Sequence, residues 1–189
     1  MDLKISKNLK DFDLVYQDMC EQFPKNELKS KTQYLKLFEN SNYKLILASD
    51  VGYILFMEDK ELNTIWIDYF AIFKKYHSQG YGSKILNTMK KLNYRGCFLE
   101  VEKIDKNKIQ TIRRVNFYKN ANAKLLDTDY YYPHSEGILA MDLYYIPFSN
   151  PHLPGNKEIE QSVKKLFSTI HKDIKTMPEA LNKFKIICR

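Results

Sequence analysis

The chain has 189 residues, 44% of them hydrophobic, and this suits a single domain with a packed core and at most a short appendage. No stretch approaches the roughly 18 continuous apolar residues of a membrane span, so we expect no membrane association. The formal net charge of +7 attracts polyanions, and nucleic acid, acidic membranes and phosphorylated cofactors all fit that description.

The first residues lack the charged-then-apolar plan of a signal peptide. Cys20, Cys97 and Cys188 are odd in number, lie far apart and have no paired metal-ligand spacing. We therefore expect reduced thiols, no metal site and a cytoplasmic protein.

The N-terminal third predicts two helices and a strand pair. Apolar residues at helical spacing indicate a helix over residues 11–23, and Asn26 can cap a second one that runs to about Phe38. Residues 44–48 and 53–57 then read as strands joined by a tight turn.

The chain is organised around residues 64–92. Residues 64–72 are β-branched and aromatic with one carboxylate, Asp68, which indicates a mostly buried strand. A basic loop with Gly80 and Gly82 follows, and then an apolar stripe typical of a helix. A glycine-bearing loop that opens a helix presents free N–H groups and the positive end of the helix dipole, so we interpret this stretch as a phosphate-binding loop.

Beyond this helix, residues 97–101 predict a strand parallel to the central one, because a helix connects the two. A helix over residues 107–120 ends near Asn122, which tolerates a left-handed conformation. Residues 124–132 and 139–145 predict a last strand pair. The fold class is therefore mixed α/β with one parallel step in the middle.

After residue 148 the composition changes. A Pro- and Gly-bearing linker leads to an amphipathic helix that carries apolar residues from Ile159 to Ile174, with a shorter helix after Pro178. We divide the chain into a domain of residues 1–148 and an extension of residues 149–189. The extension could dock on a second subunit in a homodimer, but we expect it to dock on its own domain.

One alternative for the glycine loop is a dinucleotide-binding fingerprint, Gly-x-Gly-x-x-Gly with an acid about twenty residues later. Glu100 lies at that distance. However, the third glycine position is Ile85, the loop after Ile72 is long, and the downstream strands look antiparallel. These departures disfavour a nicotinamide or flavin site.

Four motifs together resemble a known family. Residues 70–72 match a strand that ends Leu/Phe-Ala-Val/Ile, and residues 77–82 match a loop Arg/Gln-x-x-Gly-x-Gly/Ala. Residues 98–102 and 113–118 match the family's next strand and a helix that ends in Phe/Leu-Tyr. Over residues 1–148 the chain resembles the GNAT superfamily of acetyl-CoA-dependent N-acetyltransferases.

The resemblance implies a sheet whose central parallel strands splay around acetyl-CoA, with the loop on the cofactor's pyrophosphate. Two positions depart from the family pattern: His77 replaces Arg or Gln, and Asn122-Ala123 replaces Gly-Phe. The cofactor-binding residues that it implies are Phe70, Ala71, Ile72, His77, Ser78, Gln79, Gly80, Tyr81, Gly82, Ser83 and Lys84.

For catalysis, the resemblance makes Tyr118 the proton donor to the departing thiolate. Asp68 and Glu100, on the two parallel strands, are candidate bases for the acceptor amine, or each is simply paired with Arg113 or Arg114. The tyrosine-rich residues 130–133 and 144–145 either line an acceptor pocket or pack in the sheet, and we favour packing.

The first hypothesis is an N-acetyltransferase that acts on an amine of a small molecule or of a peptide or protein. The alternative is a catalytically silent CoA-binding module that regulates a partner protein through the extension. A nucleic-acid binder is disfavoured, because no helix clusters Arg/Lys and stacking aromatics on one face.

Overall fold

The computed structural model describes residues 1–6, 8–148 and 151–187. Its strands are β1 (Leu3–Ser6), β2 (Tyr43–Ala48), β3 (Gly52–Asp59), β4 (Thr64–Ile72), β5 (Gly96–Glu102), β6 (Lys124–Leu125), β7 (Thr128–His134), β8 (Gly137–Pro147) and β9 (Lys185–Ile186). Its helices are α1 (Leu9–Gln22), α2 (Lys31–Phe38), α3 (Tyr81–Met89), α4 (Ile109–Asn120), α5 (Asn156–Thr169) and α6 (Met177–Lys183).

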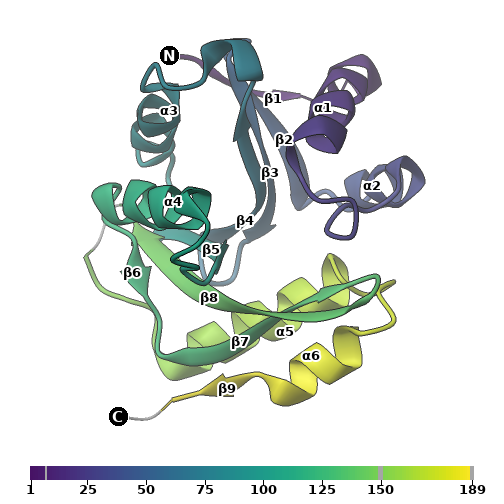
Figure 1. Ribbon diagram of the computed structural model, residues 1–189, viewed down its shortest axis with the longest axis vertical. Coiled ribbons are helices and arrows are strands. Elements are labelled where there is room, and N and C mark those ends of the chain that lie inside the picture. The colour runs from purple at the N-terminus through teal and green to yellow at the C-terminus, as the bar shows by residue number, and fades with distance from the viewer. Residues whose placement is uncertain (7, 149–150, 188–189) are drawn as a thin grey trace.

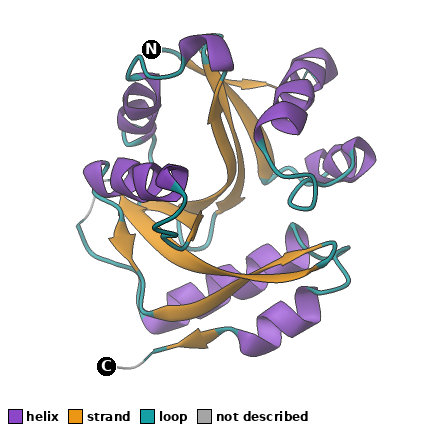
Figure 2. Cartoon of the chain, in the orientation of Figure 1, coloured by secondary structure: helices purple, strands orange, loops and turns teal. Residues whose placement is uncertain are grey.

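The strands form one mixed sheet in the order β1-β2-β3-β4-β5-β8-β7-β9, with β6 paired to β8 (Figure 1). Among the described strands only β4 and β5 pair in parallel, and α3 makes the connection between them. This confirms the predicted mixed α/β class and its central parallel step. Helices cover both faces of the sheet (Figure 2).

Two apolar clusters fill the two sides of the sheet. On one side, α1, α2, α5 and α6 pack on the sheet; Phe12 and Phe167 belong to this cluster. On the other side, α3 and α4 bury residues such as Ile85 and Val115. The amphipathic patterns in the sequence therefore predicted which face of each helix is buried.

The C-terminal extension docks on its own domain. Val163 and Phe167 of α5 are fully buried in the first cluster. Two ion pairs fasten the helix: Lys165 Nζ lies 2.7 Å from the buried Asp59, and Arg95 lies 2.6 Å from a carboxylate oxygen at the start of α5. Self-docking is thus confirmed. The division between residues 148 and 149 stays a prediction, and residues 149 and 150 lie outside the described part.

Several predicted boundaries were wrong. The second helix begins at Lys31, because Ser30 and Gln33 form a capping box that satisfies two backbone donors, whereas Asn26 caps nothing. The predicted strand over residues 124–132 is broken into β6 and β7, where the Thr128 N–H folds back to the Leu126 carbonyl at 2.9 Å.

The long C-terminal helix ends at Thr169, short of Ile174. Cys20 is exposed and Cys97 is buried, and Cys188 lies outside the described residues. Within the described ranges, no helix combines the length and the apolar character needed to cross a bilayer.

Candidate functional site

The central parallel strands separate halfway along their length. β4 and β5 pair as far as Ile67 and Leu99, and both strands continue beyond that rung. At the same level the register between β3 and β4 shifts, which leaves Asp68 opposite no residue of β3. Such a bulge bends a strand and increases its twist. Asp68 and Glu100 are therefore the first residues past the point where the strands part.

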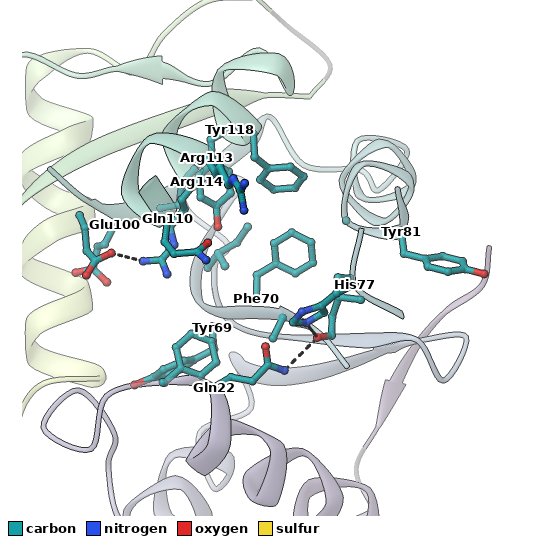
Figure 3. Close-up of a pocket in the computed structure, with 18 of the residues that line it drawn as sticks. Gln22, Tyr69, Phe70, His77, Tyr81, Glu100, Gln110, Arg113, Arg114 and Tyr118 are labelled. Carbon is teal, nitrogen blue, oxygen red and sulfur yellow. Dashed lines mark hydrogen bonds and ion pairs between the residues drawn. The ribbon is translucent and has the colours of Figure 1, made fainter. Parts of the chain in front are cut away.

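The parted strands bound a cleft of about 540 Å³ (Figure 3). Its walls come from β4, β5, α4, the loop before α3, and the end of α1 with the loop that follows. Tyr132 of β7 and Met141 of β8 line it as well, so the structure brings together segments that lie far apart in the sequence. The sequence-predicted site residues that line the cleft are Asp68, Phe70, Ala71, Ile72, His77, Ser78, Gly80, Tyr81, Gly82, Ser83, Glu100 and Tyr118.

The glycine loop ends in the N-terminus of α3. Gly80 adopts φ +77° at the N-cap, a left-handed conformation that strains other residues. The first bond of the helix runs from the Lys84 N–H to the Gly80 carbonyl at 3.2 Å, so the preceding N–H groups of the first turn are left without a helical acceptor. A Cβ on Gly82 would lie 3.1 Å from the Phe117 ring. Glycine there lets α3 approach α4 closely.

Three predicted cofactor-binding side chains contact other parts of the protein. His77 Nε2 lies 2.7 Å from the Ile72 carbonyl at the end of β4, so this ring nitrogen already has a partner within the protein. Gln79 donates to the Lys75 carbonyl and Lys84 lies over the Tyr81 ring, and neither Gln79 nor Lys84 is among the residues that line the cleft.

Tyr118 lies at the cleft wall near the end of α4. The Phe117 ring packs edge-on against its ring, with centroids 5.1 Å apart, and Phe117 in turn contacts Phe70 of β4. Burial raises the pKa of Tyr118 to about 12, although the positive charge of Arg114 opposes the shift. Its hydroxyl therefore keeps its proton at neutral pH.

Neither candidate carboxylate is paired with an arginine. Asp68 accepts a hydrogen bond from the Tyr43 hydroxyl at 2.6 Å. Arg114 pairs instead with Glu102, at 2.5 Å. The alternative in which Arg113 or Arg114 neutralises Asp68 or Glu100 was therefore wrong.

Glu100 lies in an unusual environment for a carboxyl group. It accepts a hydrogen bond from the Tyr130 hydroxyl, and its side chain is 7% exposed. Burial, reinforced by the negative charge of Asp68, raises the pKa of Glu100 to about 8; the Tyr130 hydrogen bond and the positive charge of Lys29 only partly oppose this. A carboxyl group that titrates near neutral pH in a cleft is a candidate for acid–base chemistry.

The raised pKa of Glu100 predicts how stability depends on pH. Between about pH 4.5 and pH 8 the folded protein holds a proton that the unfolded chain releases. The free energy of unfolding therefore falls as pH rises through that window, by roughly 2–5 kcal/mol. Glu100→Gln is neutral at every pH and should remove this fall, as urea unfolding at pH 4, 6 and 9 would reveal. An equally steep fall in the variant would contradict the assignment.

The tyrosine-rich segments mainly pack, as favoured from the sequence. Tyr130, Tyr144 and Tyr145 are buried in the sheet. Tyr132 lines the cleft, and its hydroxyl donates to the Glu27 carbonyl at 3.1 Å. One of the aromatic residues thus does reach the cleft.

Sequence reasoning missed several lining residues. Gln22 of α1 donates to the Ile72 carbonyl at 3.0 Å, and Glu27 follows in the loop after α1. Burial raises the pKa of Glu27. Gln110 and Arg113 of α4 also line the cleft. Gln22 and Gln110 lie on amphipathic helices and Glu27 in a loop, where no local signal distinguishes them from solvent-facing residues. Arg113 opens the matched segment 113–118, but its place in the cleft was not predicted.

The dinucleotide-binding alternative does not fit the sheet. β8, the neighbour of β5, runs antiparallel to it, so no doubly wound parallel sheet is present in the described chain. Ile85, at the third glycine position, is fully buried inside α3. The described residues contain no cluster of three or more His, Cys, Asp or Glu side chains that could hold a metal ion.

Comparison with known proteins gives a consistent result. A family model described as "Acetyltransferase (GNAT) family" matches residues 12–118. A relative from Bacillus subtilis (strain 168), named "Putative acetyltransferase YjbC", is 28% identical over 172 residues, which cover 89% of this chain and 88% of the relative.

Two solved structures show a similar fold. A GNAT-family protein from Bacteroides thetaiotaomicron matches with a TM-score of 0.76 at 21% identity, over 90% of this chain and 98% of that one. Arabidopsis thaliana NAA60, solved with acetyl-CoA, matches with a TM-score of 0.58 at 12% identity, over 79% of this chain and 99% of that one.

Proposed function

The chain belongs to the acetyltransferase (GNAT) family, and from that premise we propose that it moves an acetyl group from acetyl-CoA directly to a primary amine of a small molecule or of a peptide or protein. The observation that carries this proposal is one cleft with a phosphate-binding loop at one end and Tyr118, Asp68 and Glu100 where the strands part.

The loop end of the cleft suits the pyrophosphate of CoA. The N–H groups of Tyr81, Gly82 and Ser83 precede the first helical hydrogen bond of α3 and add to the positive end of its dipole. Gly80 and Gly82 place no side chain between this backbone and a ligand. The Ser78 and Ser83 side chains line the same end of the cleft.

The edge of β4 suits the thioester. Phe70, Ala71 and Ile72 line the cleft beyond the last rung shared with β5, so backbone groups on that edge are not used by β5. N–H groups along such an edge can hydrogen-bond the pantetheine arm and polarise the thioester carbonyl.

The carboxylate end suits the acceptor amine. Asp68 and Glu100 attract an ammonium group, and Glu100, with a pKa of about 8, can take its proton near neutral pH. The amine proton moves to the carboxylate oxygen of Glu100, and the amine nitrogen is then free to attack. Tyr118, with a pKa of about 12, holds its own proton until it donates it to the departing sulfur. The second proton of the amine nitrogen, released as the amide forms, restores the Tyr118 hydroxyl.

A ligand that binds only the folded protein must stabilise it, which provides the first test. Acetyl-CoA at a hundred times its Kd is expected to raise the melting temperature by about 5–10 °C, whereas NAD should leave it unchanged. Gly82→Val should abolish the rise, because its side chain would collide with Phe117 and obstruct the loop.

The matched control is Gly155→Val, where an added Cβ meets no atom within 4 Å; it should keep the full rise. If Gly82→Val bound acetyl-CoA as the parent does, phosphates would not sit on this loop. A separate measurement, acetyl-CoA consumption with polyamines, aminoglycosides and peptides, would identify the acceptor.

A further inference from the structure

The C-terminal extension carries a buried histidine that the mechanism above does not use. His171 follows α5 and is 0% exposed. Neither ring nitrogen has a hydrogen-bond partner. A buried polar side chain without a partner is costly, so this imidazole calls for an explanation. It also lies well outside the residues that match the family model, which end at residue 118.

The imidazole faces the candidate base. His171 Nε2 lies 3.9 Å from Glu100 Oε1, the same oxygen that accepts the Tyr130 hydroxyl. The rings of Tyr132 and Phe167 hold the imidazole nearly edge-on, with centroids 5.2 and 5.4 Å away. The gap is about 1 Å longer than a hydrogen bond, so a rotation of either side chain would bring the two atoms within hydrogen-bond distance.

Burial keeps this histidine neutral. Burial, together with the positive charge of the buried Lys29 from the loop before α2, holds the pKa of His171 well below its usual value. The other groups that act on Glu100 are Lys29 again, Asp68 and Trp66 on β4, and Tyr130 on β7. A neutral imidazole has one donor and one acceptor nitrogen. It can donate to an ionised Glu100, and in its other tautomer it can accept from a protonated one.

We propose that His171 is a positioning residue that holds the Glu100 carboxyl group in place, so that the C-terminal extension forms part of the active site. This inference rests on the proposed function, in which Glu100 takes the acceptor proton. That proton passes from the amine nitrogen to a carboxylate oxygen of Glu100 and leaves to solvent through the cleft. His171 gains no net proton, and it stabilises the carboxylate by donating from Nε2.

The test replaces His171 by a ring of similar size. His171→Phe keeps the packing against Tyr132 and Phe167 but removes the donor to Glu100. A hydrogen bond to a charged group favours the ionised form, so its loss should raise the pKa of Glu100. The pH at which kcat/KM rises, as Glu100 ionises, should then be higher by about one to two pH units. His171→Asn, which retains a donor, should restore part of the shift. Acetyl-CoA affinity should be unchanged.

Phe167→Leu is the matched control for packing. It disturbs the same buried cluster and should lower the melting temperature without changing the pH at which kcat/KM rises. In a Glu100→Gln background, His171→Phe should cause no further loss of turnover, because it acts through Glu100. The proposal is overturned if the pH at which kcat/KM rises is unchanged in His171→Phe, or if it shifts equally far in Phe167→Leu.

A titration that needs no turnover separates this inference from the proposed function. Carbon-13 NMR of labelled glutamate side chains reports the pKa of Glu100 in the free protein. The Glu100 signal is assigned as the one that disappears in Glu100→Gln. An upward shift in His171→Phe supports the coupling even if no amine is acetylated, in which case the proposed function fails alone. An unchanged pKa overturns the coupling even if the enzyme is active.

Discussion

Tyr118→Phe is expected to slow turnover by about 100- to 10,000-fold, the usual worth of a positioned general acid. The substitution removes only the hydroxyl and keeps the ring that packs against Phe117. Acetyl-CoA affinity should therefore survive, and the loss should appear in kcat. Single-turnover measurement is the proper assay, because slow product release would mask part of the effect.

Tyr132→Phe is the matched control. Tyr132 lines the same cleft, but its hydroxyl bonds the Glu27 carbonyl and has no assigned proton to give. It should lose far less activity. Full single-turnover activity in Tyr118→Phe would contradict the donor role. A parent protein that binds CoA tightly yet acetylates no amine would favour the regulatory module instead.

Glu100→Gln is expected to lower kcat/KM by about 100- to 10,000-fold at pH 7.5, because the amide cannot accept the amine proton. In the parent protein, kcat/KM should rise with pH through the pKa of Glu100, about 8, since only the ionised carboxylate acts as a base. The variant should lack that rising limb. Initial rates from pH 6 to pH 10 would measure both effects.

The other carboxylates of the cleft serve as controls. Asp68→Asn removes a charge at the neighbouring position, which tests whether Asp68 rather than Glu100 is the base. Glu102→Gln removes the partner of Arg114 at the wall and should retain most of the activity. A rising limb preserved in Glu100→Gln but lost in Asp68→Asn would transfer the role of base to Asp68.

The sequence alone determined the centre of this fold. The strand over residues 64–72 was predicted with the bounds that β4 has. The glycine loop, the helix after it and the parallel strand were also predicted, because their signals are local. Apolar periodicity identifies a helix or strand, and glycine marks a position where another segment or a ligand can approach the backbone closely. Asn122 adopts φ +69°, the left-handed conformation expected for the end of α4.

Predictions failed where two local signals competed or where a segment was short. Asn26 and Ser30 are both good capping residues, and only Ser30 has its glutamine three positions later as a partner. β1 and β9 are four and two residues long, too short to produce a periodic pattern. Such strands form because a neighbouring edge is available, which is a property of the folded chain.

For the site, the sequence supplied the residues and the tertiary structure supplied their environment. Tyr118 could be named from a family resemblance, and Asp68 and Glu100 from their places on the two parallel strands. Nothing local, however, predicts that Glu100 titrates near neutral pH. That property arises because the fold buries its carboxyl group and places the negative charge of Asp68 nearby. Desolvation and charge act through space, so a pKa is decided by what the fold brings near a residue and not by that residue's neighbours in sequence.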